Sequence, residues 1–219
     1  MKLSASLHNC SYLHMKEELD ALVAGGVDLF HIDLMDGHYV PNLCMPIDMI
    51  AEFKEAYPQV KMDIHIMVEN PEDYVDRLAR AGTDYLSFHT DSTRFSRRLI
   101  SQIRAAGMKP GILINPSQQV EHILPLAKYV DMVTLMTVEP GFPGQSFLSD
   151  GMERLQALAD LRRENGLDFL ISVDGGVSTE ICTQCRQIGV DVIVGTVWTI
   201  FKQPCGLEQA CKNFYRDFG

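Results

Sequence analysis

The sequence predicts an α/β fold, a single (β/α)8 TIM barrel that occupies residues 1–219 as one domain. Three observations lead to this prediction. About eight short apolar runs alternate with longer segments of helical spacing, a Gly-x-Asp triplet recurs before several of these runs, and no linker or low-complexity segment divides the chain. The length of 219 residues also lies near the lower limit of the ~200 to 250 residues usual for such a barrel.

The predicted strands are rich in Val, Ile, Leu and aromatic residues, as expected for strands covered on both faces. In chain order they are residues 2–7, 29–35, 61–68, 85–89, 109–115, 132–138, 169–174 and 192–196. An open doubly wound sheet is the alternative, but no G-x-G-x-x-G sequence follows the first run.

Helices are predicted between these runs, most clearly over 15–26, 71–82, 150–166 and 179–189. Glycine closes these segments, at the position where a helix C-cap favours a left-handed residue, and Pro71 is expected to open one of them. The Gly-x-Asp triplets join helix to strand and suggest one βα unit used repeatedly. They are Gly26-Val27-Asp28, Gly82-Thr83-Asp84 and Gly189-Val190-Asp191.

The composition limits the partners of the protein. With 29 acidic and 19 basic residues, the net charge is −10, which disfavours binding to nucleic acid or to anionic membranes. No apolar run approaches the ~18 residues of a membrane span, and the N-terminal residues do not resemble a signal peptide. We therefore expect a cytoplasmic protein.

The six cysteines are scattered and are expected to be free thiols. Cys182 and Cys185 form a C-x-x-C sequence, but the second pair that a zinc ribbon requires is missing. Helix packing is the favoured interpretation of this pair, because residues three apart share one face of a helix.

Four potential metal ligands lie on the faces of strands that should point into the barrel. Strict alternation places His31 and Asp33 on the inward face of one run, His65 on that of the next, and Asp174 on that of a late run. Two imidazoles and two carboxylates suit one divalent transition metal ion, zinc in the first place, with iron, manganese or cobalt as alternatives. A buried hydrogen-bonded polar cluster is the competing interpretation.

The remaining histidines give weaker signals. His14, His89 and His122 have no partner at ligand spacing and are expected to be surface or hydrogen-bonded residues. Asp36 and His38 lie in a loop that either lines the mouth of a pocket or only forms a turn.

Glycine-rich turns after the late strands predict a site for an anion. Residues 140–145 follow the sixth predicted strand, 174–176 the seventh and 195–196 the eighth. Glycine lets backbone N–H groups approach a phosphate closely, and the loops after strands seven and eight are the usual phosphate site of TIM barrels. Backbone amides need no Lys or Arg, so the acidic net charge does not exclude a phosphate ligand.

Several motifs resemble the ribulose-phosphate 3-epimerase family, in matching order between Ser4 and Phe201. They are residues 31–42 (HIDLMDGHYVPN), 63–68 (DIHIMV), 136–147 (MTVEPGFPGQSF) and 173–176 (VDGG). The resemblance implies a metal-dependent TIM barrel of the ribulose-phosphate-binding type, an isomerase that inverts C3 of a ketose phosphate. It also implies a homo-oligomer.

The same resemblance assigns expected roles to single residues. His31, Asp33, His65 and Asp174 match the metal ligands, and Asp33 and Asp174 also match the proton acceptor and proton donor of a reaction through a cis-enediolate. Substrate-binding positions are matched by Ser6, His65, Gly141, Phe142, Pro143, Gly144, Gly175, Gly176, Gly195 and Thr196. Pocket-lining positions are matched by Met35, Met67 and Met136.

The chain departs from the family pattern near the expected sugar site. His8, on the expected inward face at the top of the first strand, adds an imidazole to the pocket where the family has an apolar residue. Pro143 replaces a glycine and removes one N–H, and Thr196 replaces the more usual serine. Ribulose 5-phosphate is the first expectation for the substrate. Allulose 6-phosphate is a nearly equal alternative, because the sequences of residues 78–82, 136–142 and 193–196 more closely resemble the branch of the family that acts on it.

Two other function classes compete with epimerisation. A sugar-phosphate decarboxylase on a related barrel would need a lysine in an Asp-x-Lys-x-x-Asp sequence, and residues 33–36 contain none. A noncatalytic sugar-phosphate-binding barrel would show no solvent exchange at C3.

Overall fold

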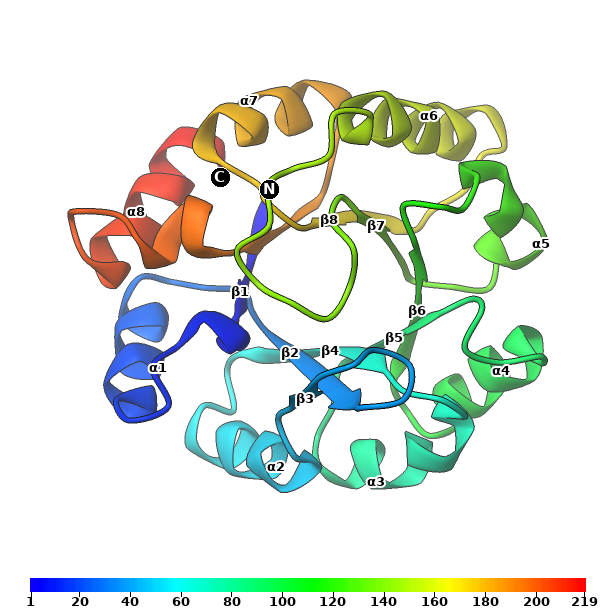
Figure 1. Cartoon of the computed structure of the whole chain (residues 1–219), viewed down its shortest axis with the longest axis horizontal. Helices are drawn as coiled ribbons and strands as arrows, with labels where there is room; N and C mark the ends of the chain where they lie inside the picture. The colour runs from blue at the N-terminus through cyan, green and yellow to red at the C-terminus, as the bar shows by residue number, and fades with distance from the viewer.

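A closed barrel of parallel strands forms the centre of the computed structural model, which describes residues 1–219, and helices surround it (Figure 1). The barrel strands are β1 (Lys2–Ser6), β2 (Leu29–Asp36), β4 (Lys61–Met67), β5 (Tyr85–His89), β6 (Lys109–Ile114), β7 (Met132–Met136), β8 (Leu170–Asp174) and β9 (Val192–Gly195). β1 pairs with both β2 and β9, which closes the sheet. The predicted (β/α)8 barrel is confirmed, and the short β3 (Leu43–Cys44) adds an antiparallel strand at the end of β2.

Helices alternate with the strands around the barrel. They are α1 (Met15–Ala24), α2 (Ile47–Ala56), α3 (Val75–Arg80), α4 (Ser96–Ala105), α5 (Leu124–Ala127), α6 (Gly151–Glu164), α7 (Thr179–Ile188) and α8 (Leu207–Phe218). Pro71 opens a 3-10 turn, η2 (Pro71–Tyr74), and the α-helix begins only at Val75. None of the helices has both the length and the apolar character that a membrane crossing requires.

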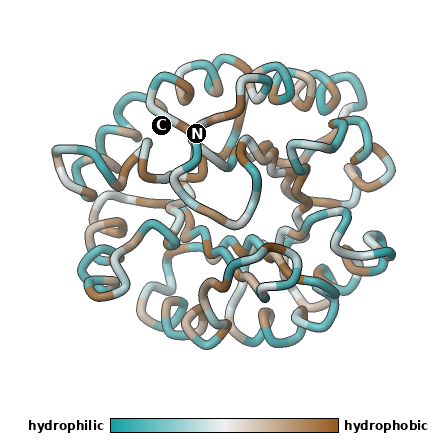
Figure 2. The backbone as a smooth tube through the Cα atoms, viewed as in Figure 1, coloured by the Kyte–Doolittle hydropathy of each residue, from teal (hydrophilic) through white to brown (hydrophobic).

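The main hydrophobic core lies between the outer face of the barrel and the helices. Phe30, Ile32, Ile64 and Ile66 point outward from their strands and are fully buried in this layer. Figure 2 shows this distribution of hydropathy. The helices around the barrel are mostly hydrophilic along the outside of the molecule, and hydrophobic residues lie toward the barrel. All six cysteines are free, and Cys182 and Cys185 are buried on α7 within this core.

The interior of the barrel changes from apolar to polar along its axis. At the N-terminal end of the strands, Leu29, Tyr85, Met132 and Val192 come from alternate strands and form one packed layer. The strand register places the next layer at Ser4, Asp63, Gly111 and Ser172. The apolar layer therefore closes one end of the barrel, and polar side chains fill the space between it and the opposite mouth.

The recurring Gly-x-Asp triplet has a structural reason at the closed end. Each aspartate accepts a hydrogen bond from a backbone N–H at the start of the neighbouring strand, and each also contacts a side chain from a helix or strand end. The backbone pairs are Asp28 with Leu3 N (3.0 Å), Asp84 with Met62 N (3.0 Å) and Asp191 with Ile171 N (2.8 Å). These contacts tie the helix-to-strand joins to the sheet.

Asp84 allows a test of this role. Its carboxylate binds Lys54 Nζ (2.8 Å) and Lys61 Nζ (2.9 Å) in addition to the Met62 N–H, and these contacts lower its pKa against the effect of burial. Asp84→Asn should lower the free energy of unfolding at pH 7 by about 1 to 3 kcal/mol, measured by urea denaturation. A lowered carboxyl pKa stabilises fully above the unfolded pKa, and this contribution is lost as pH falls through the folded pKa, so the difference from wild type should shrink below pH 4. An equal difference at pH 7 and pH 3 would contradict this account.

Candidate active site

The predicted site residues gather at the mouth of the barrel, on the side where the strands end. A cavity there is covered in part by the loop between β7 and α6, which lies over the centre of the barrel in Figure 1. The predicted residues that line it are Ser6, His8, Asp33, Met35, His65, Met67, Met136, Gly141, Phe142, Pro143, Gly144, Asp174, Gly175, Gly176 and Thr196. His31 lies just below the cavity, with 3% of its surface exposed, and Gly195 is buried against Leu3 and Ile200 rather than at the cavity wall.

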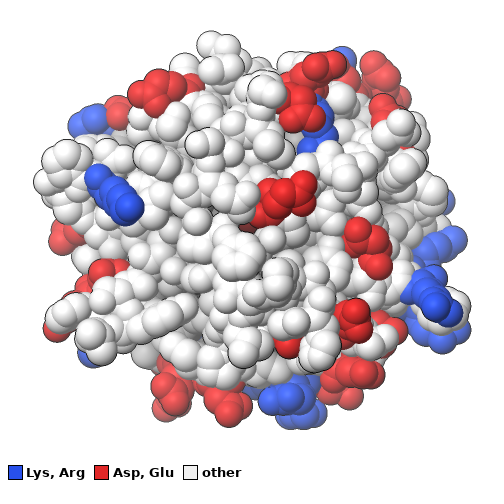
Figure 3. Space-filling model, viewed as in Figure 1, with Lys and Arg blue, Asp and Glu red and all other residues white.

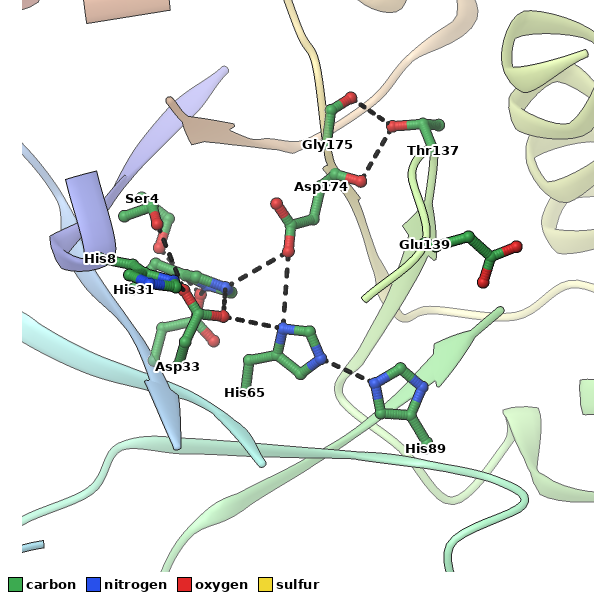
Figure 4. Close-up of polar contacts among 12 residues, drawn as sticks. Ser4, His8, His31, Asp33, His65, His89, Thr137, Glu139, Asp174 and Gly175 are labelled. Atoms are coloured by element: carbon green, nitrogen blue, oxygen red, sulfur yellow. Dashed lines mark hydrogen bonds and ion pairs between the residues drawn. The ribbon is translucent and has the colours of Figure 1, made fainter. Parts of the chain in front are cut away.

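Four side chains from three strands converge at the floor of this cavity (Figure 4). The Oδ1 atom of Asp33 lies 3.2 Å from His65 Nδ1 and 3.6 Å from His31 Nε2. The Oδ2 atom of Asp174 lies 3.5 Å from each of these two nitrogens. One ligand atom from each of the four residues falls within 4.8 Å of all the others.

The donor set fits a divalent cation. His31 Nε2 and His65 Nδ1 are buried and have no hydrogen-bond partner that meets normal geometry, yet both face the two carboxylates. Uncompensated carboxylates in a barrel interior carry a large desolvation cost, which a cation between them removes. Two nitrogens and two oxygens converging on one point are a ligand set typical of zinc and related metals.

Two further residues hold the histidines, and the sequence analysis did not assign them. The other nitrogen of His31, Nδ1, lies 2.9 Å from Asp63 Oδ2, and that carboxylate also accepts a hydrogen bond from Ser4 Oγ (2.8 Å). The other nitrogen of His65, Nε2, lies 2.8 Å from Nε2 of His89. The alternation pattern does place Asp63 inward, and His89 is a hydrogen-bonded histidine as expected, but sequence spacing gives no sign of these pairings.

The electrostatics of the cluster reflect mutual stabilisation of opposite charges. Burial alone would lower the pKa of His31, but the charge of Asp63 and the nearby carboxylates of Asp174 and Asp33 hold it well above its ordinary value. Burial would raise the pKa of Asp33, but the nearby imidazoles of His31 and His65 hold it well below. The pKa of His65 is likewise raised, and the pKa of Asp174 is likewise lowered. Without a cation, protons on the imidazoles therefore supply the positive charge.

Ser6 and His8 both lie near Oδ2 of Asp33, whereas His65 faces Oδ1. Ser6 Oγ donates a hydrogen bond to Asp33 Oδ2 (3.3 Å), and His8 Nδ1 lies 3.9 Å from the same oxygen. β1 ends at Ser6, so His8 belongs to a 3-10 turn, η1 (Leu7–Asn9), and not to the strand as expected. Its side chain nevertheless reaches the cavity and is 15% exposed.

The three predicted methionines form apolar walls above the charged floor. Met35 and Met67 pack with Val40, and Met136 packs with Leu113 and Val138. All three methionines are at least 94% buried. A ligand on the charged floor would therefore meet apolar, polarisable surface beside its reacting atoms.

The turn after β8 contains two glycines because other backbone segments pack directly against it and leave no room for a side chain. Gly175 and Gly176 have φ angles of 115° and 65°, and a Cβ at Gly176 would lie 2.3 Å from Phe147 N. The Thr137 hydroxyl supports the turn from below by donating to the carbonyl oxygens of Gly175 (2.6 Å) and Asp174 (2.9 Å). Thr137 is a functional candidate that the sequence analysis missed, because only the β7–β8 register brings it to this turn.

The turn after β9 leads into a π-helical segment, η4 (Val197–Phe201), which brings an aromatic residue to the cavity. Trp198 lines the cavity mouth, is 47% exposed, and its indole N–H donates to the backbone oxygen of Gln145 (3.3 Å). Thr196 in the same turn also lines the cavity, and its side chain and that of Thr199 form a capping box at the start of η4. The loops after β7 and β9 are thus joined across the mouth.

No Lys or Arg lines the cavity. In Figure 3, which shows this face, the basic side chains lie away from the centre and acidic ones lie nearer to it. An anion bound here must therefore rely on backbone N–H groups, hydroxyls and any bound cation.

Comparison with known proteins places this site in a family. The model of the ribulose-phosphate 3 epimerase family matches residues 2–200. The chain belongs to the ribulose-phosphate 3-epimerase family. Its relatives include the ribulose-phosphate 3-epimerase of Treponema pallidum, 37% identical over 88% of this chain and 88% of the relative. Another is the enzyme of Methanocaldococcus jannaschii, 36% identical over 89% and 82%, and a third is a cytoplasmic isoform of Oryza sativa, 37% identical over 88% and 84%.

Membership of the ribulose-phosphate 3-epimerase family makes the chain an isomerase that acts on a ketose phosphate. The fold is shared more widely. The 3-hexulose-6-phosphate synthase of Salmonella typhimurium superposes with a TM-score of 0.73 over 100% of both chains, at 17% identity. A protein named KGPDC from Streptococcus mutans gives the same score at 11% identity, covering 99% of this chain and 96% of that one.

The raised pKa of His31 generates a pH prediction for the protein in a metal chelator. Protonated His31 should stabilise the fold fully below its unfolded pKa of 6.5, and this contribution should be lost as pH rises through the raised folded pKa. The free energy of unfolding should therefore fall between pH 6 and pH 9, measured by urea denaturation. His31→Gln, the control, should remove most of this slope, and the same slope in both proteins would contradict the prediction.

Proposed function

We propose that this protein epimerises C3 of a ketose phosphate through a cis-enediolate, with Asp33 and Asp174 as acid and base, in one catalytic domain over residues 1–219. The observation that carries the proposal is the convergence of these two carboxylates, from β2 and β8, on a shared pair of imidazoles. Ribulose 5-phosphate, interconverted with xylulose 5-phosphate, is the proposed substrate, in keeping with the names of the relatives.

Inversion needs two proton-transferring groups on opposite faces of the sugar. Asp33 would accept the proton from C3 while the C–H electron pair moves to the C2 carbonyl and forms the enediolate. Asp174, whose lowered pKa means that it must first take up a proton from solvent, would deliver this proton to C3 from the other face, which restores the carbonyl with inverted configuration. The reverse reaction uses the same two groups with their roles exchanged.

A free aspartate is a weak base for a C–H bond, so the site must acidify the substrate. A divalent cation held by His31, Asp33, His65 and Asp174, zinc in the first place, would stabilise as a Lewis acid the negative charge that develops on the C2 and C3 oxygens. Ser6 would orient Asp33 through its hydrogen bond. Met35, Met67 and Met136 would exclude water from the reacting plane.

The phosphate is proposed to bind the turns after β7, β8 and β9. Positive φ angles at Gly141, Gly144, Gly175 and Gly176 support this assignment, because such turns can aim backbone N–H groups at an anion. Thr196 supports it as well, because it lines the cavity at the turn after β9. Gly195 would act by leaving space for Leu3 under the turn rather than by touching the ligand.

Allulose 6-phosphate, converted to fructose 6-phosphate, is a second candidate substrate, and His8 is the observation that favours it. Its imidazole reaches the cavity beside Asp33, where it can hydrogen-bond an additional sugar hydroxyl. A decarboxylase reaction that uses a lysine is not supported, because the cavity wall contains no lysine.

The two-carboxylate mechanism predicts solvent exchange that depends on both aspartates. In D₂O, the wild-type protein should incorporate deuterium at C3 of ribulose 5-phosphate, observed by proton NMR. Asp33→Asn and Asp174→Asn should each lower turnover by at least about 10³-fold, because each removes a proton-transferring group. Asp36→Asn, at the end of β2 but outside the cavity lining, is the matched control and should keep activity within a few fold. Turnover near wild type in either site variant would refute the mechanism.

The role of His8 predicts a change in substrate preference. The ratio of kcat/KM for ribulose 5-phosphate to that for allulose 6-phosphate should rise by about 10-fold or more in His8→Leu, because the larger sugar loses a hydrogen bond. Steady-state assays with both sugars measure this ratio. Equal losses on the two sugars would show that His8 does not select between them.

A further inference from the structure

His65 uses both of its ring nitrogens, and only one arrangement of protons allows it to bind a cation. The Nε2 atoms of His65 and His89 are 2.8 Å apart, so one proton must lie between them. His65 Nδ1 faces the carboxylates of Asp33 and Asp174 and must be unprotonated to act as a ligand. The proton of neutral His65 then resides on Nε2, and His89 Nε2 must be the acceptor.

The ring of His89 is fixed by its surroundings. It is completely buried at the end of β5, and the ring of Tyr39 stacks on it with centroids 4.8 Å apart and planes inclined at 31°. The Tyr39 hydroxyl donates to Asp91 (2.8 Å) and accepts from Asn115 Nδ2 (2.8 Å). Figure 4 shows His89 directed at His65 from the side opposite to Asp33. Burial and this stacking restrict the His89 ring. Its Nδ1 has no hydrogen-bond partner, so the contact with His65 is the one hydrogen bond of the ring.

His31 and His65 differ in the partner that orients them. The partner of His31 is the carboxylate of Asp63, whereas the partner of His65 is a second imidazole. Asp33, Asp174 and Asp63 already bring three carboxylates into this region. A neutral acceptor at His89 orients His65 without adding a fourth negative charge, which would weaken the electron-withdrawing power of the bound cation.

We propose that His89 is a positioning residue, which accepts the His65 Nε2–H and thereby presents His65 Nδ1 as an unprotonated metal ligand. This inference rests on the proposed function, since it assumes that the four residues bind a cation. It makes the residue at position 89 a determinant of metal affinity although it does not touch the metal.

The test compares two variants of similar size, His89→Gln, whose side-chain oxygen can still accept the hydrogen bond, and His89→Phe, which keeps a planar ring but has no acceptor. Zinc affinity is measured by competition with a chromophoric chelator, and the cobalt(II) visible spectrum reports the geometry of the site. His89→Phe should weaken zinc binding by about 10- to 100-fold, and His89→Gln should stay within about threefold of wild type. The thermal unfolding of all three proteins in chelator serves as the control for folding.

Wild-type zinc affinity in His89→Phe, or equal losses in both variants, would overturn the inference. If His89→Phe does not fold, the zinc-loaded wild type still gives an answer through the ¹⁵N NMR spectrum of its histidine rings. There His89 should carry its proton on Nδ1, and a proton on Nε2 would overturn the proposal.

These readouts are independent of turnover, so a protein that binds zinc with this tautomer but epimerises neither sugar would contradict the proposed function alone. A wild type that binds no divalent cation would contradict both.

Discussion

Compensation of buried negative charge is the constraint on which the site depends. Asp33, Asp63 and Asp174 lie inside a barrel whose far end is sealed by an apolar layer, so solvent reaches them only from the mouth. Charges in such a place persist only when opposite charge and hydrogen bonds accompany them. The imidazoles of His31 and His65 meet this requirement in one of two ways: they are protonated and carry positive charge, or they bind a metal cation that carries it. The cost of the arrangement thus favours binding of a metal. Under the proposed mechanism, the carboxylates of Asp33 and Asp174 would then lie on either side of a substrate.

Much of this arrangement was predictable from the sequence because strands impose a period of two. In a barrel, alternate residues must point inward, so the positions of His31, Asp33, His65 and Asp174 in their runs already indicated a shared interior. The repeated Gly-x-Asp triplet likewise indicated a repeated unit, and the structure gives its reason in the hydrogen bonds of Asp28, Asp84 and Asp191 to neighbouring strands.

The pairings between inward residues were not predictable, because they depend on strand register and on ring orientation. Ser4 on β1 meets Asp63 on β4 past the intervening β2, and His65 meets His89. Thr137 reaches the turn at Gly175 only through the alignment of β7 with β8. Local conformations in loops were also missed, because they have no repeating sequence pattern from which they could be predicted. The 3-10 turn that carries His8, the short β3 and the π-helical η4 follow from how loops close over the barrel rather than from any repeated pattern.

The π-helical turn after β9 has a spectroscopic consequence. Trp198 is the only tryptophan in the chain, and it stands at the cavity mouth with its indole N–H bonded to the loop after β7. Excitation selective for indole therefore reports from a single location, and the remainder of the fold contributes no signal. The molecule carries its own optical probe where the two loops meet, so ligand entry and loop displacement can be followed in real time without a label.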